Sequence, residues 1–501
     1  MKKNILANFA GKFWSIISNF VFIPIYIKLI GFESYSIISF AIMITGVMTI
    51  LDSGLTATLS REFARKDNKH KDKLEIFKTL QSCFFLIVFL CISIIFLSSD
   101  FLAKEWINVK SFQSDQIAQF IKIISFETGF QLLLRFYIGG LLGLERQVDA
   151  NLFQIFWGIL RNFLVIPIIY FFPDLTTFFL WQAFSTFIFT VLIKFTLEKR
   201  LFRKIMFSVK IRFEKRVLIK IFNFAGGMML ISLVAALNTQ MDKITISKLL
   251  SIENLGYYTL SVSLAQSLLM LVNPITTALL PRFTSYYSTS DHQLSRNLFN
   301  KASLLISIIV FTGMIVMSFF SKTIVFIWTG NNDIAQKTST IIPIITFAYA
   351  MLSLQILPFN VAISNGYTRL NNILGLVSLI VTIPGYYIAI KNHGPQGAAV
   401  VFCFIQVVTT FIYIYFINKK FIKNDFKEIF LKQIILPLLF IATIIFLFSK
   451  FSWPFQYGKI ISLFWIAFIA IFTLLLTLKL FLSKSEMKSL IATNPDSKKT
   501  L

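Results

Sequence analysis

Charged and amide side chains inside long apolar segments are the residues of this chain best suited to chemistry. Glu127, Gln131 and Arg135 are spaced by four, which places them on one face if the segment is a helix. A guanidinium offers fixed, forked donors that match phosphate oxygens, and a carboxylate in a wet cavity can titrate. Arg135 is therefore the best candidate to bind a phosphate group, and Glu127 is a candidate to couple a proton or a cation.

A second interpretation of these charges is structural. At about 1.5 Å per residue, Glu127 lies roughly 14 Å from the outer end of its segment, and Arg161 lies at a similar depth on the next, antiparallel segment. Charge in the hydrocarbon region costs at least a few kcal/mol, so a buried Glu127–Arg161 pair is an alternative for both residues. Glu127 and Arg135 are about 12 Å apart along the axis, too far to pair directly.

Further basic residues lie closer to the ends of apolar segments. They are Lys12, Lys28, Lys122 and Lys243. Lysines in such positions extend their heads to the membrane surface, which is one interpretation of all four. The other is that Lys28 and Lys243, together with Arg135 and Arg161, bind an anionic ligand.

Neutral amide side chains lie inside apolar segments in the second half of the chain. Gln266 and Asn273 are seven residues apart, hence on one helical face, and Gln355 lies in a later segment. Amides along a cavity suit sugar hydroxyls, which need donors and acceptors without net charge. Equally, amides hold membrane helices together by hydrogen bonds between them. The sequence leaves both interpretations open.

The elements that must position these residues are membrane helices. Hydrophobic residues make up 56% of the 501 residues, and the mean hydropathy is +0.75, far above the value for soluble domains. Windows of about 20 residues predict about fourteen crossing segments. They are 13–30, 35–58, 80–98, 118–143, 150–172, 176–197, 221–247, 255–279, 302–320, 338–362, 373–390, 396–417, 433–449 and 460–482.

The net charge of +25 is mostly a topology signal. Lys and Arg gather in alternate gaps, which predicts by the positive-inside rule that both termini are cytoplasmic. These basic residues lie between apolar segments and not on the face of a soluble domain, so they do not indicate nucleic-acid binding. The three histidines fall in predicted loops, and the three cysteines fall in apolar runs without CxxC spacing. We therefore expect no metal or other cofactor.

An internal repeat predicts how the segments are organised. Asn8–Gly11 and Asn223–Gly226 both read NFAG, and each opens an apolar segment. Further matches at one shared offset are Thr56-Ala57 with Thr277-Ala278, Arg61 with Arg282, and Asn151 with Asn372. Each copy has six segments, an even number, so the repeat is parallel. We predict six-helix lobes at 1–215 and 216–418 around a central cavity, and a C-terminal helix pair with a cytoplasmic tail at 419–501.

These motifs and their order resemble a known family. They are the NFAG lobe openings, Gly31–Tyr35, Asp52–Leu55 with Arg61, Gly143–Gln147, Met241–Lys243, Gly256–Tyr258, Leu280–Arg282 and Gly394–Ala399. Over about residues 5–420 the chain resembles the multidrug/oligosaccharidyl-lipid/polysaccharide flippase superfamily, and within it the Wzx-type polysaccharide (O-antigen) transporters.

The resemblance implies a function. It implies a flippase, not an enzyme, that moves an undecaprenyl-diphosphate-linked oligosaccharide across a bacterial inner membrane by alternating access, for O-antigen or capsule assembly. The implied partners are this lipid-linked substrate, membrane lipids and other polysaccharide-assembly proteins, and we expect a monomer.

Two alternatives stay open. The first is an ion-coupled multidrug exporter of the same fold, for which the basic excess among Glu127, Arg135 and Arg161 is unfavourable. The second is a membrane polysaccharide polymerase or ligase. The short outer gaps are unfavourable for such an enzyme, because the longest, around 100–116, has too few residues for a folded outer domain.

Overall fold

The computed structural model describes residues 18, 20–50, 52–65, 70–202, 233–423, 426–451, 455–456, 458–483 and 485–487. These residues are helical apart from turns, short connections and one isolated bridge between Asn108 and Ser251. Contacts divide the chain into two compact units, Met1–Gly256 and Tyr257–Leu501. Both NFAG motifs and the predicted lobe boundary at 215/216 lie outside the described residues.

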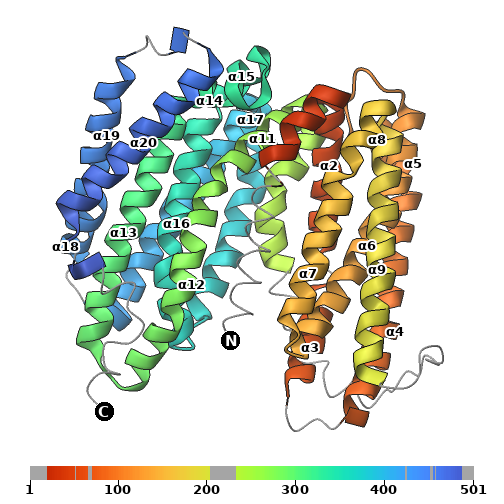
Figure 1. The fold of residues 1–501 in the computed structure, drawn as a ribbon, viewed down its shortest axis with the longest axis horizontal. Helices are drawn as coiled ribbons and strands as arrows, with labels where there is room; N and C mark the ends of the chain where they lie inside the picture. The colour runs from red at the N-terminus through yellow and green to blue at the C-terminus, as the bar shows by residue number, and fades with distance from the viewer. Residues whose placement is uncertain are drawn as a thin grey trace. The chain divides into compact units, whose positions relative to one another are not determined.

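Unit 1 is a set of apolar helices joined by short turns, in red to yellow-green in Figure 1. Its helices are Phe20–Ile30, α2 (Phe32–Met48), α3 (Ser53–Ala64), α4 (His70–Leu97), α5 (Ser99–Phe101), the π-helix η1 (Leu102–Trp106), α6 (Ser114–Gly143), α7 (Gln147–Gly158), the π-helix η2 (Ile159–Phe163), α8 (Val165–Phe171), α9 (Leu175–Phe202) and residues 233–249. α11 (Ile252–Ala265) begins in unit 1 and ends in unit 2.

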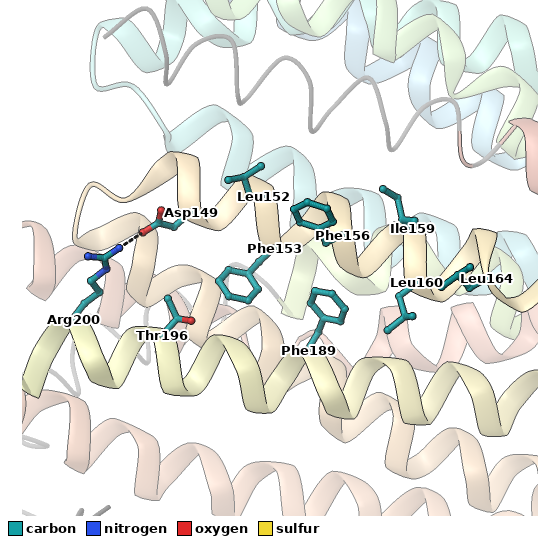
Figure 2. A pocket seen from close by; sticks show the side chains of 10 residues that line it. All are labelled: Asp149, Leu152, Phe153, Phe156, Ile159, Leu160, Leu164, Phe189, Thr196 and Arg200. Carbon is teal, nitrogen blue, oxygen red and sulfur yellow. Dashed lines mark ion pairs between the residues drawn. The ribbon is translucent and has the colours of Figure 1, made fainter. Parts of the chain in front are cut away.

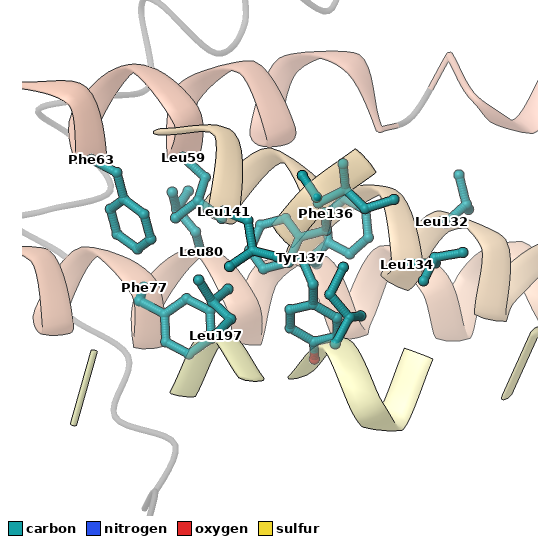
Figure 3. Packing of buried hydrophobic residues seen from close by; sticks show 14 of the residues in the cluster. Leu59, Phe63, Phe77, Leu80, Leu132, Leu134, Phe136, Tyr137, Leu141 and Leu197 are labelled. Carbon is teal, nitrogen blue, oxygen red and sulfur yellow. The ribbon is translucent and has the colours of Figure 1, made fainter. Parts of the chain in front are cut away.

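The central helix of unit 1 is α6, which packs against α3, α4 and α9. Its most apolar stretch is 72% buried, more than that of any other long span in the described part of the chain. Figure 3 shows the side chains that meet there, including the fully buried Leu59, Phe77, Phe136 and Leu197. Lipid is as apolar as these side chains, so close packing holds the helices together more than the hydrophobic effect does.

Unit 2 is a second helical bundle, in green to blue in Figure 1. After α11 it contains α12 (Ser267–Ser288), α13 (His292–Phe319), α14 (Ser321–Thr329), α15 (Asn332–Ser339), α16 (Ile342–Ser364), α17 (Arg369–Ile417), η3 (Asn418–Ile422), α18 (Phe426–Glu428), η4 (Ile429–Ile435), α19 (Leu436–Ser449) and α20 (Lys459–Phe481). α16 packs against α12, α13 and α17, and the C-terminal pair α19 and α20 packs against α13.

The long helix α17 is two spans. Its backbone breaks at Gly394, where φ is 60° and ψ is −146°. That conformation is accessible to glycine and strained for other residues, and Pro395 then starts the second half. The predicted segments 373–390 and 396–417 lie on either side of this break.

The all-helical membrane fold is confirmed. Ten helices of the described residues are long and apolar enough to cross a bilayer. Dividing α17 at Gly394 adds one span, Phe20–Ile30 and α2 are shorter apolar helices, and residues 233–249 form a further helix. The prediction of about fourteen crossings is compatible with this arrangement.

Three details of the sequence analysis can be compared with the helices. The predicted continuous segment 35–58 is wrong, because α2 ends at Met48 and α3 begins at Ser53. A hydropathy window averages over this break. The predicted loop positions of the histidines are also wrong: His70 and His292 begin helices and His393 lies in α17 beside the break, because the helices extend beyond their apolar stretches. Cys83, Cys91 and Cys403 are free thiols within helices; Cys91 is buried and the other two are half-buried.

Candidate functional site

The helices α2 and α3 run alongside α6 in one register. Thr45 of α2 lies 3.1 Å from Thr128 of α6 (Oγ1 to Oγ1), a separation of 83 residues. A Cβ added to Gly139 of α6 would lie 2.4 Å from the side chain of Thr56 on α3, a pair with the same separation. Glycine at position 139 therefore permits the close approach of α3, and the register is constant along both helices.

This register places Asp52 opposite Arg135. Asp52, at the start of α3, is 6% exposed and accepts a hydrogen bond from Thr56 Oγ1. Its carboxylate and the Arg135 guanidinium are close enough to interact electrostatically. The Arg135 side chain is exposed, and no hydrogen bond or ion pair at contact distance reaches its guanidinium from the described residues. Arg135 is thus a cation near a buried carboxylate with its donors still accessible.

Glu127 and Arg161 form the ion pair that the helix depths predict. Arg161 Nη2 lies 2.6 Å from Glu127 Oε1, and Gln131 Nε2 donates to the same oxygen at 2.8 Å. Glu127 is 3% exposed, whereas the Arg161 side chain is 23% exposed. The structural interpretation of this pair is therefore confirmed, and its additional role in transport remains a prediction.

Arg161 lies in the π-helix η2, whose backbone is held by other helices. The bonds run from Trp181 Nε1 to Leu160 O (2.9 Å), from Gln182 Nε2 to Arg161 O (3.1 Å) and from Tyr26 Oη to Asn162 O (2.9 Å). The Arg161 guanidinium also lies 5.2 Å from the ring centroid of Trp157, within cation–π distance. Single π-helical turns are frequent at functional sites, and this one presents Arg161 to Glu127.

Asp52 is the site residue that the sequence analysis missed. It lies in the predicted apolar segment 35–58. A charged residue inside an apolar segment is the signal that identified Glu127 and the basic candidates, and the same signal would have identified Asp52. With Asp52 included, two carboxylates face two guanidinium groups, so the argument from a basic excess is wrong for this cluster. What distinguishes its members is exposure: Arg135 is exposed, whereas Asp52 and Glu127 are buried.

The two predicted lysine ligands lie elsewhere in unit 1. Lys28 is exposed on the helix Phe20–Ile30. Lys243 donates to Thr239 O at 2.9 Å and lies 3.7 Å from Asp242 Oδ1, with 15% of its side chain exposed. Among the described residues, no hydrogen bond or ion pair joins either lysine to the Glu127–Arg161 pair. Their equal depth near the outer surface stays a prediction.

The predicted amides of unit 2 lie on two helix interfaces and one exposed face. Gln266 Nε2 donates to Tyr349 Oη at 3.2 Å, between α12 and α16. Gln355 Oε1 accepts from Thr410 Oγ1 at 3.4 Å, between α16 and α17. Asn273 is exposed on α12. Gln266 and Gln355 thus hold helices together, and the role of all three amides as sugar ligands stays a prediction.

A second polar cluster, which we call the clamp, ties the loop 105–111 to α2 and to residues 247–253. Glu33 of α2 accepts the backbone N–H groups of Lys110 and Ser111 at 2.6 and 3.1 Å, and Lys110 Nζ lies 2.9 Å from Glu253 Oε2. The remaining bonds run from Ile252 N to Asn108 O (3.0 Å), from Trp106 Nε1 to Ser247 Oγ (3.1 Å) and from Lys248 Nζ to Glu105 O (2.5 Å).

Breaking the Glu127–Arg161 pair should destabilise the protein asymmetrically. We expect Arg161→Ala to cost about 3–5 kcal/mol, because it leaves a carboxylate buried without its charged partner. Glu127→Gln should cost less, since Arg161 keeps access to water. The measurement is the thermal unfolding midpoint in detergent, with Lys122→Ala near the end of α6 as the control. Equal midpoints for the two variants would contradict the asymmetry.

The chain matches one family model. The family is described as polysaccharide biosynthesis protein, and the match covers residues 1–287. Over 374 residues the chain is 21% identical to a Shigella flexneri protein named as an O-antigen transporter, and this alignment spans 74% of the chain and 86% of that protein. The sequence similarity therefore extends over most of both chains.

Solved structures share the fold at low identity. The lipid II flippase MurJ, in an inward closed conformation, gives a TM-score of 0.75 at 14% identity, over 98% of this chain and 100% of that one. An inward-facing MATE multidrug resistance transporter of the MOP superfamily gives 0.67 at 12% identity, over 81% and 94%. The family model covers more than half of the chain, so this protein belongs to the polysaccharide biosynthesis protein family, and it has the fold of the flippase superfamily that its sequence resembles.

Proposed function

We propose that the protein is a flippase for a lipid-linked oligosaccharide, an undecaprenyl-diphosphate-linked repeat unit used for O-antigen or capsule assembly. One observation carries the proposal: Arg135 is exposed with accessible donors, while Asp52 and Glu127 nearby are buried. A diphosphate entering this cluster meets a guanidinium and not a carboxylate. Membership of the polysaccharide biosynthesis family and the similarity to a named O-antigen transporter support this substrate class.

The proposed mechanism is alternating access between lobes 1–215 and 216–418. Arg135 holds the diphosphate, the lipid tail stays in the bilayer, and amides such as Asn273 meet the sugars. The Glu127–Arg161 pair holds η2 against α6, and Arg161 joins Arg135 when substrate arrives. The sequence contains no GxxxxGK[ST] motif, so the energy comes from an ion gradient, with Glu127 as the coupling group, or from removal of product outside.

In this proposal the clamp closes the outer side of the transport path. The positive-inside rule assigns the loop 105–111 to the outer side, and residues 247–253 belong to the predicted second lobe, so the clamp joins the two lobes there. The Lys110 side chain is 67% exposed, and such surface ion pairs contribute at most about 1 kcal/mol each. A clamp of several weak bonds can open and close during each transport cycle.

The proposed cellular setting follows from the topology and the substrate. The protein lies in the bacterial cytoplasmic membrane with both termini inside, where it receives substrate from the enzymes that build the repeat unit. We propose that it acts as a monomer, with other polysaccharide-assembly proteins as partners.

Deletion of the gene tests the proposed function. Intact lipid-linked repeat units should accumulate in the inner leaflet, and surface polysaccharide should fall at least a hundredfold, because assembly of the units continues while export stops. The measurement is mass spectrometry of extracted lipid-linked sugars, with a plasmid copy of the gene as the control.

Other outcomes of the deletion would contradict the proposal. Truncated repeat units would indicate a transferase instead. Full-length polymer retained on its carrier would indicate a ligase, and unchanged sugars with new sensitivity to organic cations would indicate a multidrug exporter.

A further inference from the structure

An apolar groove runs along the face of unit 1 between α7–η2 and α9. Its volume is about 520 Å³, within the range of roughly 300–1,000 Å³ found for sites of small molecules. Figure 2 shows its lining, which is apolar along most of its length and ends at the ion pair of Asp149 and Arg200. From Asp149 to Leu164 the groove follows the helix axis for about 22 Å. It is therefore long enough to take an extended hydrocarbon chain.

The walls of the groove carry large apolar side chains that are exposed on unit 1. Leu152 is 45% exposed and Phe156 is 56% exposed, although both lie within a span long enough to cross the bilayer. Phe153, Leu160 and Phe189 complete the sides. Exposed large side chains in the middle of a span contact lipid, and a recess between two helices can hold one chain of a lipid in a fixed place.

One end of the groove carries a small excess of positive charge. Asp149 Oδ2 lies 3.1 Å from Arg146 Nε and 3.5 Å from Arg200 Nη2, so two guanidinium groups share one carboxylate. About half of each arginine side chain is exposed. Close by in the sequence, Glu145 and Lys199 are exposed and of opposite charge, so they do not change this balance. The positive-inside rule assigns this end to the cytoplasmic surface.

We propose that this groove binds a phospholipid of the inner leaflet that has an anionic headgroup. One acyl chain lies between α7 and α9, and the phosphate takes the donors of Arg146 and Arg200 that Asp149 leaves unused. Basic pockets between membrane helices on the cytoplasmic side recognise anionic headgroups in this way, because a guanidinium donates two parallel bonds to phosphate oxygens. The site is separate from Arg135, and its existence does not depend on the proposed transport activity.

Lipid retention by the purified protein tests this site. The probes are phosphatidylglycerol and phosphatidylcholine with identical acyl chains, each added to delipidated protein in detergent, and the readout is the number of lipids retained in native mass spectrometry. We expect one phosphatidylglycerol to be retained at least tenfold more strongly than phosphatidylcholine. Removal of both headgroup donors, in Arg146→Ala/Arg200→Ala, should abolish that preference.

Two further variants separate the groove from general effects. Leu152→Trp fills the groove without changing any charge, and it should lower retention of both lipids. Arg369→Ala removes an exposed arginine at the start of α17, outside the groove, and should behave as the wild type. Circular dichroism checks that each variant is folded. Equal retention of the two lipids by the wild type, or an unchanged preference in Arg146→Ala/Arg200→Ala, would show ordinary annular lipid and overturn the proposal.

Discussion

If the protein exports lipid-linked repeat units as proposed, replacing Arg135 with alanine should lower their delivery to the outer surface about a hundredfold. The expectation follows from the accessible Arg135 guanidinium. Asp52, Glu127, Arg135 and Arg161 form one cluster, and among the described residues Arg135 is its exposed member and has no hydrogen-bond or ion-pair partner for its donors. Loss of one partner of a desolvated charge pair costs about 2–5 kcal/mol, and about 1.4 kcal/mol corresponds to a factor of ten. Arg135→Lys keeps the positive charge but not the forked N–H donors of the guanidinium, so delivery should fall about tenfold.

The measurement is surface polysaccharide in the deletion strain that carries each variant, normalised to the amount of protein in the membrane. Lys122→Ala is the matched control, because Lys122 lies on the same helix and pairs with Asp100 at 3.7 Å. Wild-type delivery by Arg135→Ala at equal protein level would contradict the proposed binding role.

A purely structural role for Arg135 predicts a different result in one double variant. If Arg135 served only to neutralise Asp52, then Asp52→Asn/Arg135→Ala would remove both charges and restore delivery. If Arg135 binds the diphosphate, the double variant should stay as defective as Arg135→Ala. The two outcomes differ by about a hundredfold, which a polysaccharide assay resolves.

The Glu127–Arg161 ion pair was predictable from the sequence, because it depends only on the depth of each residue in the membrane. Glu127 and Arg161 lie on consecutive antiparallel helices, so counting residues from the outer end of each helix gives their depths, and the observed pair has a 2.6 Å contact. The same arithmetic excludes direct pairing of Glu127 with Arg135. Membrane topology and the cost of buried charge thus carry much of the information in a single sequence.

The Asp52–Arg135 relation required information that the sequence does not contain. It depends on the register of α3 against α6, which the close approach at Gly139 and the Thr45–Thr128 hydrogen bond fix. A hydropathy window also hides the break between Met48 and Ser53 that places Asp52 at a helix start. Register between helices is a property of packing, and one sequence without its contacts leaves it undetermined.

Loops set the same limit on prediction. From the sequence, 100–116 is only a short outer gap, too short for a folded domain. The clamp forms there from backbone groups of Asn108, Lys110 and Ser111, whose partners lie far away in the chain. Backbone groups carry no residue-type signal, so their bonds to Glu33 and Ile252 could not be predicted.

Locking the clamp should stop transport completely. Asn108 and Ser251 form an isolated parallel bridge, and neighbouring strands lie about 4.8 Å apart, within the Cα separation of about 4.4–6.8 Å that a disulfide spans. We expect oxidised Asn108→Cys/Ser251→Cys protein to deliver no polysaccharide above the deletion background, because the outer side stays closed. Reduction should restore delivery, since the clamp contributes no substrate ligand.

The design of this experiment depends on the weakness of the individual bonds. Removing one exposed ion pair, as in Lys110→Ala, shifts an opening equilibrium by at most about 1 kcal/mol and should change delivery less than about fivefold. Only a covalent bond makes the closed state permanent. Cys83, Cys91 and Cys403 are replaced by alanine in all variants, and each single cysteine variant serves as the oxidised control. If the cross-linked protein delivers polysaccharide as fast as the same variant after reduction of the disulfide, the clamp does not open during transport, and the outer path must lie elsewhere.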